Sequence, residues 1–225
     1  MKRFKLMIPI LIMMMVAVVL VGCGQKNEEE KGEVRRFEST PAALLELANG
    51  GIDAVVADSP VVLEYIRNNQ EANLKAFGDD SFEKEFYGIA MRQEDTELHT
   101  LVNDGLAAIK ANGVYDKIFN VYFGDGAEYT VEESDNSLNV TYTVAQDMAY
   151  APFESINSAN EPEGFDCDLI RAIAAEMGFA VKLENTNWDG IIPSLVGGSS
   201  DMIISAMTIT EERKESVFFS DPYFE

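Results

Sequence analysis

One short segment limits the fold of this chain more than any other: an apolar run at residues 201–207 that is followed at once by a hydroxyl-rich turn. The run reads Asp-Met-Ile-Ile-Ser-Ala-Met and shows almost no alternation of polar and apolar residues. Such a run is typical of a strand that is covered on both faces, as in the parallel sheets of α/β proteins. We therefore predict a parallel strand within an α/β layer.

The hydroxyl-rich turn, Thr208 to Arg213, predicts the start of a helix with one residue that needs an explanation. Thr210 can cap the helix, and two acids follow it in the first turn, where the helix dipole favours negative charge. Arg213 opposes that dipole, and a carboxylate partner bound in a two-pronged way beside free N–H groups would account for it. The alternative is that Arg213 pairs with Glu211, Glu212 or another acid of the chain.

The N-terminus predicts export followed by lipid attachment. A basic start precedes an uncharged apolar stretch from Leu6 to Val21, and Leu-Val-Gly-Cys at residues 20–23 resembles a lipobox. We expect residues 1–23 to be a signal peptide and the Cys23 thiol to carry acyl chains such as palmitate, which would anchor the protein at the extracytoplasmic face of the cell membrane. An uncleaved signal anchor is the alternative. Residues 24–33 are polar and predict a flexible tether.

Charge and cysteine content exclude several kinds of partner. The formal charge is −22, and loss of the three basic residues of the signal makes it −25, so nucleic acid is not an expected partner. With Cys23 acylated, Cys167 is the only other cysteine, and we expect it to be a small core residue without a disulfide. Acids flank Cys167, but a metal site lacks ligands at suitable spacing and His99 is the only histidine. We expect no metal and no cofactor.

The chain divides into two blocks, residues 34–124 and 138–225, separated by an acidic, polar stretch. Capping residues, glycine stops and apolar periodicity predict helices and strands in alternation, the pattern of an α/β fold. In the first block, helices are predicted at 40–49, from Ser59 on, at 96–112 and at 114–122, and strands at 52–57 and 87–91. In the second block, strands are predicted at 138–145, 180–184 and 201–207, helices at 168–178 and from Trp188 on, and a loop at 146–154.

Six short stretches carry a more specific signal. They are Gly-Phe-Asp-Cys-Asp-Leu at 164–169, Trp-Asp-Gly-Ile-Ile-Pro at 188–193, Thr208–Arg213, Phe-Ser-Asp-Pro-Tyr at 219–223, Ile52–Pro60 and Asn112–Tyr115. Together they resemble family 3 of the extracellular solute-binding proteins, the two-lobed receptors that deliver polar amino acids to ABC importers. The resemblance covers nearly all of residues 34–124 and 138–225, although Cys167 stands where an aliphatic residue or threonine is more usual in that family.

The order of these stretches differs from the family's order. There, the stretch that ends in Asp-Pro-Tyr precedes the stretch that here spans Ile52–Pro60, whereas in this chain it follows it. A hinge strand and a glycine- and threonine-rich turn of the second lobe have no counterpart here. The chain is either a circular permutant or the product of a broken or collapsed pair of receptor genes, and the end at Glu225 favours the second explanation.

The resemblance implies an α/β fold of the type II periplasmic-binding-protein-like class, in which the second lobe is incomplete. After the signal peptide and tether, it divides the chain into part of lobe two (34–88), a strand and helices that close lobe one (89–124), a linker (125–137) and the main part of lobe one (138–225). We expect a sound lobe one and a weakened lobe two.

The same resemblance implies how a zwitterionic ligand would be bound, since both of its charges need partners once they leave water. Arg213 would bind the ligand carboxylate in a two-pronged way, helped by the N–H and hydroxyl of Thr208. The Ala206 carbonyl and Asp58 would accept hydrogen bonds from the ligand ammonium group.

Three further residues are candidate ligand contacts. Asp147 would be a second acid, at the mouth of the site or on the ligand side chain, and Tyr150 and Trp188 match positions where aromatic rings sandwich the ligand. Each position has a plainer alternative: Trp188 as an ordinary core residue, and Asp58 as a helix N-cap before Ser59.

The resulting prediction is a monomeric lipoprotein, not an enzyme, that captures a polar amino acid and delivers it to an ABC transporter permease when its lobes close. With the hinge strand and turn absent, we expect weak or no binding. A secreted dehydratase-like enzyme on the same fold is one alternative, although a solitary His99 and no grouping of acid, base and nucleophile argue against it. A ligand-sensing ectodomain is the other.

Overall fold

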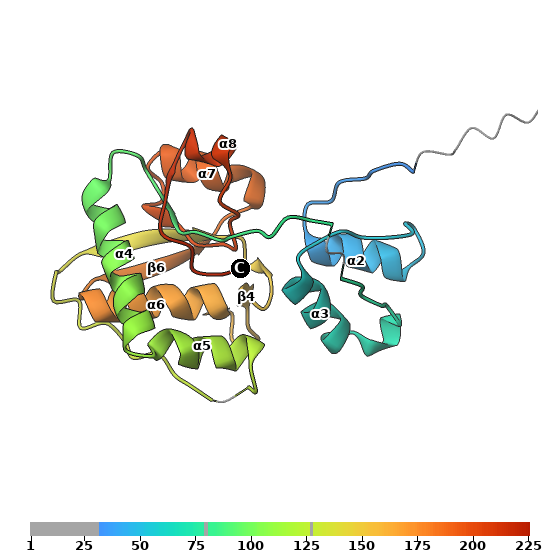
Figure 1. Ribbon diagram of the computed structural model, residues 1–225, viewed down its shortest axis with the longest axis horizontal. Coiled ribbons are helices and arrows are strands. Elements are labelled where there is room, and N and C mark those ends of the chain that lie inside the picture. Colours follow the sequence, from blue (N-terminus) through green and yellow to red (C-terminus); the bar gives the residue numbers. More distant parts are fainter. Residues whose placement is uncertain (1–31, 79–80, 127) are drawn as a thin grey trace, which may run out of the picture. The chain divides into compact units, whose positions relative to one another are not determined.

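The computed structural model of the chain describes residues 32–78, 81–126 and 128–225 (Figure 1). The predicted signal peptide, Cys23 and most of the predicted tether lie outside the described residues. Residues 36–225 form one compact unit. None of the helices in the described ranges is long and apolar enough to cross a membrane.

Helices and short strands alternate along the described chain. The helices are α2 (Thr40–Ala48), α3 (Ser59–Asn68), the 3-10 helix η1 (Gln70–Ala72), α4 (Thr96–Ala111), α5 (Val114–Phe123), α6 (Phe165–Met177), α7 (Trp188–Val196) and α8 (Glu211–Lys214). The strands are β1 (Ala90–Met91), β2 (Thr141–Gln146), β3 (Ala149–Tyr150), β4 (Glu154–Ile156), β5 (Pro162–Glu163), β6 (Ala180–Asn185), β7 (Met202–Ile203) and β8 (Phe218–Phe219).

The main sheet has five strands in the order β6-β2-β7-β1-β8. Strand β2 runs parallel to β6 and to β7, with Val144 opposite Met202. Strand β1 is antiparallel to both of its neighbours and lies between β7 and β8, so a strand from before residue 92 is inserted among strands that come after residue 200. The α/β class is confirmed. The parallel strand predicted at 201–207 is present, but its ladder covers only Met202–Ile203.

The sheet is covered on both faces, which explains the continuous apolar run. Val144 and Met202 belong to the larger core cluster, which also holds buried side chains of α4, α5 and α6. Their neighbours along the strands, Ala145 and Ile203, belong to a second cluster with Ile191 of α7. Successive strand residues point to opposite faces, so a strand between two helical layers must be apolar at every position. In Figure 1, α6 and α7 lie on opposite sides of these strands.

Capping residues and apolar periodicity predicted the ends of most helices to within a few residues of the observed ends. The cap of α2 is Ser39, whose extended backbone lets its hydroxyl accept from the Ala42 N–H at 3.4 Å. Helix α6 begins at Phe165, three residues before the predicted start at Asp168. Thr210 caps α8 as predicted, its hydroxyl accepting from the Arg213 N–H at 3.2 Å.

The strand predicted at 52–57 is wrong. Residues 54–58 have no regular secondary structure, and Val56 is 79% exposed. A strand needs a partner to bond its backbone, and no strand pairs with this segment in the described part of the chain. Large apolar side chains stand exposed across the same region: Val34, Leu45, Val56, Leu63, Phe77, Phe82 and Phe86. Few of its residues are buried, as expected for an incomplete lobe.

A second, smaller sheet occupies a region that was predicted as a loop. Strands β3, β4 and β5 pair antiparallel in that order, with Tyr150 opposite Glu154. The peptide bond between Ala151 and Pro152 is cis and lies in the turn that joins β3 to β4. The strands are two or three residues long, too short for a periodic sequence pattern to reveal them. This sheet carries Tyr150 and Glu154 toward the candidate site.

Candidate functional site

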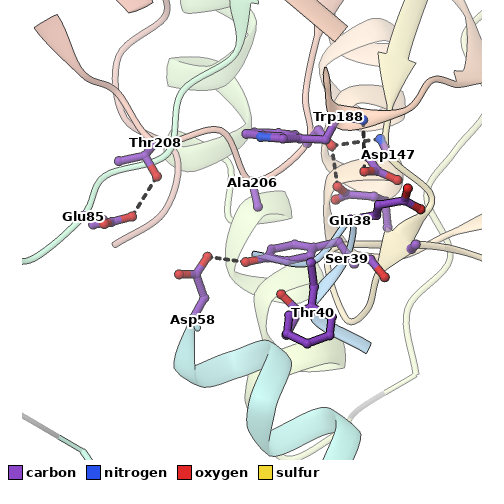
Figure 2. Close-up of a pocket in the computed structure, with 14 residues that line it drawn as sticks. Glu38, Ser39, Thr40, Asp58, Glu85, Asp147, Trp188, Ala206 and Thr208 are labelled. Atoms are coloured by element: carbon purple, nitrogen blue, oxygen red, sulfur yellow. Dashed lines mark hydrogen bonds between the residues drawn. The ribbon is translucent and has the colours of Figure 1, made fainter. Parts of the chain in front are cut away.

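A cavity of about 270 Å³ brings together residues from three parts of the compact unit (Figure 2). Its lining comprises Phe37, Glu38, Ser39, Thr40, Asp58, Glu85, Asp147, Ala149, Tyr150, Glu154, Trp188, Ser205, Ala206 and Thr208. Six of the seven sequence-predicted ligand contacts are among them. Arg213 is the seventh, and it touches two of the lining residues without being one.

Arg213 is held against the cavity by Trp188 and Thr208. Its guanidinium carbon lies 5.2 Å from the centroid of the Trp188 ring, and Nη1 donates to the Thr208 carbonyl at 2.7 Å. Partial burial lowers the pKa of Arg213, an effect that the charges of Glu85 and Glu212 oppose. Within the described ranges no carboxylate lies in ion-pair contact with Arg213, so the alternative of a pairing with Glu211 or Glu212 is not met.

Trp188 is a cavity residue rather than a core residue. It is the first residue of α7 and is 37% exposed. Its backbone N–H donates to Asp147 Oδ2 at 3.2 Å, which binds the end of β2 to the start of the helix. Partial burial raises the pKa of Asp147, and this hydrogen bond partly offsets the effect. Both residues therefore face the cavity from adjacent elements.

Asp58 reaches the cavity as the acceptor of two tyrosine hydroxyls. Tyr150 and Tyr87 each donate to its Oδ2, with both O···O distances 2.5 Å. Burial raises the pKa of each tyrosine, and the Asp58 charge raises it further, so both remain protonated donors. Asp58 does occupy the N-cap position of α3, but its side chain makes no capping bond. The sequence did not predict a role for Tyr87 at this site, since it was predicted only as the first residue of a strand.

Two buried acids belong to the site, and one of them, Glu154, lines the cavity. Glu154 and Asp166 are both fully buried, and burial together with their mutual repulsion raises the pKa of Glu154. Burial also raises the pKa of Asp166. Glu154 accepts from the Ser205 hydroxyl at 2.5 Å, and that hydroxyl accepts from the Asp147 N–H at 2.9 Å. A relay therefore joins the buried pair to a predicted ligand contact.

The other acid of the pair fixes the backbone at Ala206. Asp166 Oδ2 accepts from the Ala206 N–H and from the Tyr223 hydroxyl, both at 2.7 Å. Ala206 has φ of 42°, a left-handed conformation that costs free energy in a residue other than glycine. With the N–H engaged below, the Ala206 carbonyl is the backbone group left for a ligand. Asp166 lies in the 164–169 stretch that resembles the family, although no role was predicted for it.

The cavity is strongly acidic. Glu38, Asp58, Glu85, Asp147 and Glu154 all line it, and Arg213 is the cation beside it. Carboxylates around an aromatic wall favour a ligand that carries positive charge. The arrangement can hold a cation and, at the Arg213 end, a carboxylate.

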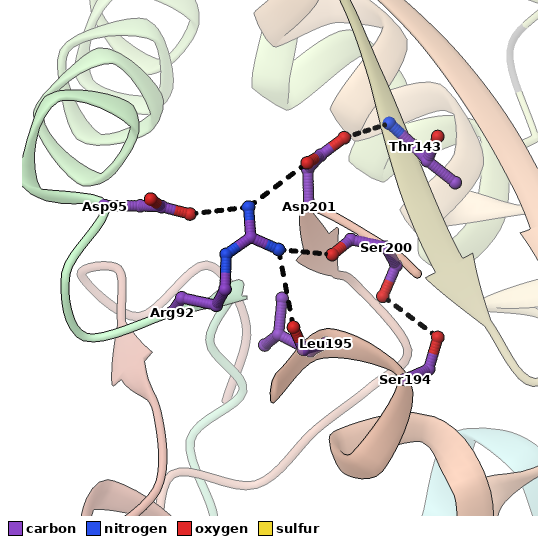
Figure 3. A network of polar contacts seen from close by, with 7 residues as sticks. All are labelled: Arg92, Asp95, Thr143, Ser194, Leu195, Ser200 and Asp201. Atoms are coloured by element: carbon purple, nitrogen blue, oxygen red, sulfur yellow. Dashed lines mark hydrogen bonds and ion pairs between the residues drawn. The ribbon is translucent and has the colours of Figure 1, made fainter. Parts of the chain in front are cut away.

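Another polar network lies away from this cavity (Figure 3). Arg92, just after β1, pairs with Asp95 at 2.7 Å and with Asp201 at 3.1 Å, and donates to the Ser200 carbonyl at 2.6 Å. Asp201 in turn accepts from the Thr143 N–H at 2.8 Å. None of these residues lines the cavity at Trp188, and the network fastens the inserted strand β1 to the strands around it.

The described residues contain no group of three or more side chains suited to hold a metal ion. Cys167 is a free thiol with no exposed surface, and it donates to Gln146 Oε1 at 3.3 Å. Burial raises the pKa of this thiol, so it is not a thiolate ligand or nucleophile at neutral pH. The prediction that it is a core residue is confirmed.

Residues 142–225, which hold all of this site except Asp58, Glu85, Tyr87 and residues 37–40, match the bacterial extracellular solute-binding proteins, family 3. This segment is thus similar to members of that family over 84 residues or fewer. The match confirms the predicted family and, with the observed α/β sheet, the predicted periplasmic-binding-protein-like fold class. The order of the two halves stays a prediction, as does the division of the chain into lobes, because the match covers one half only.

Two curated relatives are each 45% identical to this chain over the residues that they match. A probable histidine-binding protein of Neisseria gonorrhoeae is 45% identical over 84 residues, which are 37% of this chain and 31% of the relative. ABC transporter arginine-binding protein 1 of Escherichia coli (strain K12) is 45% identical over 76 residues, 34% of this chain and 31% of the relative. The chain therefore spans about a third of the length of the curated relatives it matches.

A solved structure, the arginine-bound form of domain 1 from TmArgBP, is 41% identical with a TM-score of 0.38, covering 41% of this chain and 74% of that one. The names of the two curated relatives describe binding proteins.

Proposed function

We propose that this chain captures a polar amino acid in the cavity and delivers it to the permease of an ABC transporter. The observation that carries the proposal is the cavity itself, since it is lined both by Asp58 from the first block and by Asp147, Trp188 and Thr208 from the second. A ligand that bridges the two blocks would draw them together, which is how closure could signal to a permease.

The charges suggest which end of an amino acid goes where. Arg213 and the Thr208 hydroxyl bind the carboxylate, because the Arg213 side chain is fixed beside Thr208 and lacks an ion-pair partner in the described ranges. The Ala206 carbonyl and Asp58 accept from the ammonium group. Tyr150 and Trp188 cover the apolar stem of the ligand.

The ligand is a basic amino acid. Four carboxylates besides the buried Glu154 line the cavity, and an acidic side chain would meet repulsion there. Burial raises the pKa of Asp147, and a cationic ligand beside it would stabilise the charged form of its carboxylate. The names of the similar proteins, which mention histidine and arginine, agree with this class.

Binding is weaker than in a complete receptor. The first block has few buried residues and an exposed apolar surface, so ordering it around a ligand consumes part of the interaction energy. Isothermal titration of the purified chain with arginine, lysine, histidine, glutamine and glutamate tests the proposal. We expect heat with the basic amino acids and none with glutamate. No heat with any amino acid, for a chain shown to be folded, contradicts it.

The chain acts as a monomeric lipoprotein, held at the extracytoplasmic face of the cell membrane through acylated Cys23. Two acyl chains suffice for stable anchoring, whereas one does not. Labelling cells with a palmitate analogue should mark the wild-type chain and leave Cys23→Ser unlabelled and absent from the membrane fraction. Labelling of the variant would contradict this part of the proposal.

A further inference from the structure

Glu85 places a carboxylate at the end of the cavity where the carboxylate of a ligand is expected to bind. Glu85 Oε2 accepts from the Thr208 hydroxyl at 2.7 Å, and both residues line the cavity. Arg213 donates to the carbonyl of the same threonine at 2.7 Å. Figure 2 shows Glu85 and Thr208 on the side of the cavity away from Asp147. Thr208 is thus hydrogen-bonded both to the Glu85 carboxylate and to the Arg213 guanidinium.

Backbone pairing holds Glu85 at this position. The Ile209 N–H donates to the Phe86 carbonyl at 2.8 Å, and the Gly88 N–H donates to the Met207 carbonyl at 3.1 Å. Tyr87 and Thr208 form an antiparallel bridge between these two bonds. Glu85 therefore stands beside Thr208 because the isolated bridge at Tyr87 sets the register of this segment, although the Glu85 side chain is exposed.

The charge of Glu85 also acts on Arg213. Burial lowers the pKa of Arg213, and among the charges that raise it again Glu85 contributes more than Glu212. The guanidinium therefore already has a carboxylate in its field.

We propose that Glu85 occupies the place of a ligand's α-carboxylate and so inhibits the chain's own binding of amino acids. This inference deepens the proposed function and rests on it. An incoming carboxylate must displace Glu85 from the Thr208 hydroxyl and then remain near a second negative charge, which costs free energy. An amine ligand without a carboxylate meets no such competition.

The alternative role for Glu85 gives the opposite result. If Glu85 recognised the positive charge of the ligand, its removal would weaken every cationic ligand. Competition predicts instead that removal helps ligands with a carboxylate and not those without one. L-arginine and agmatine, its decarboxylated form, differ in that group and therefore separate the two roles.

The experiment compares Glu85→Gln with the wild-type chain by isothermal titration. We expect the variant to bind L-arginine about tenfold more tightly, and agmatine no more tightly than the wild type does. Glu38→Gln is the matched control, because Glu38 is another exposed carboxylate that lines the same cavity; it should tighten neither ligand. Weaker binding of L-arginine by Glu85→Gln, or equal tightening of both ligands, overturns the inference.

A second measurement does not depend on any amino acid. The side-chain N–H resonance of Arg213, assigned by its loss in Arg213→Lys, should shift with pH in the wild type and shift clearly less in Glu85→Gln, where Glu212 is the remaining charge that acts on it. A wild-type resonance that does not shift overturns the inference. If the resonance shifts but no amino acid binds to the wild type or to Glu85→Gln, the placement of Glu85 beside Thr208 and Arg213 stands and the proposed function fails.

Discussion

The Arg213 guanidinium lies over the Trp188 indole, its carbon 5.2 Å from the ring centroid, although the two residues come from different helices. Stacking and the bond to the Thr208 carbonyl fix the plane of the guanidinium before any ligand arrives. A planar fork that is already oriented loses less conformational entropy when it binds a carboxylate.

Arg213→Lys should therefore weaken the binding of L-arginine at least tenfold, a loss of about 1.4 kcal/mol. Lysine keeps the charge but loses the planar fork and much of the stacking on Trp188. Isothermal titration measures the affinity. Arg67→Lys is the control, because the Arg67 side chain is 67% exposed on α3. Equal affinities in the two variants would contradict the role of Arg213.

Asp58→Asn should lower the pKa of Tyr87 and of Tyr150. Burial is the larger cause of both raised values, so they should stay above the ordinary tyrosine range, but the part due to the Asp58 charge is lost. Ultraviolet titration of tyrosinate formation measures the change, and Asp53→Asn, on an exposed residue nearby, is the control. Ionisation curves that match the wild type would show that Asp58 does not bridge the tyrosines in solution.

Much of this fold could be predicted where each residue's role is local. The apolar run at 201–207, the Thr210 cap and the α4 and α5 patterns each depend on near neighbours in the chain, and each is confirmed. The strand at 52–57 has the same kind of apolar run and still failed, because a strand also depends on a partner that the sequence pattern cannot supply.

The candidate site divides in a similar way. The six lining residues predicted from the sequence came from the resemblance to a family, and only Asp58, Trp188 and Thr208 lie in the short stretches that carry it. Glu85, Tyr87, Glu154 and Asp166 were missed, since each acts through a residue distant in the chain. Glu85 is 123 positions from its partner Thr208, and no spacing rule connects the two.

The buried acids should make stability fall as pH rises. Burial raises the pKa of Glu154 and of Asp166, so the folded chain keeps protons that the unfolded chain releases above about pH 4. Their contribution is full below that pH and is lost as pH climbs toward the folded pKa values. The side chain at position 154 cannot titrate in the Glu154→Gln variant. The free energy of unfolding of this variant should therefore fall with pH less steeply than that of the wild type, and the two slopes should differ by up to about 1.4 kcal/mol per pH unit.

Urea unfolding between about pH 5 and about pH 8 measures this slope, and that range spans most of the expected window. Glu161→Gln, on an exposed residue, is the control and should keep the wild-type slope. Identical slopes in the wild type and Glu154→Gln would contradict the assignment of a raised pKa to Glu154.

Gly164→Ala and Gly190→Ala should change stability in opposite directions. Gly164 has φ of 130°, and a Cβ there would lie 2.2 Å from the Phe153 carbonyl oxygen, so alanine should destabilise the fold by about 3 kcal/mol or more. Gly190 lies inside α7 with nothing within 4 Å of its ideal Cβ, so alanine should stabilise by about 0.5–1 kcal/mol. Thermal unfolding measures both, and equal shifts would contradict the strained backbone at Gly164.

The Arg92 network gives the last test, since it joins the inserted strand to the strands around it. Arg92→Lys keeps a charge near Asp95 and Asp201 but loses the fork that also reaches the Ser200 carbonyl, so we expect a loss of about 1–2 kcal/mol. Arg92→Ala leaves partly buried acids unpaired and should cost about 3 kcal/mol. Urea unfolding measures both losses.

Arg67→Ala provides the matched control, because it removes an arginine whose ion pair with Glu64 is exposed on one side, where such pairs contribute at most about 1 kcal/mol. If Arg92→Ala cost no more than Arg67→Ala, the inserted strand would not depend on this network. Strand β1 lies between β7 and β8 and directly follows the stretch that places Glu85 and Tyr87 beside Thr208. Loss of the Arg92 side chain should therefore also destabilise the position of that stretch. The same variant should therefore weaken ligand binding along with stability, whereas Arg67→Ala should leave ligand binding unchanged and cost at most about 1 kcal/mol of stability.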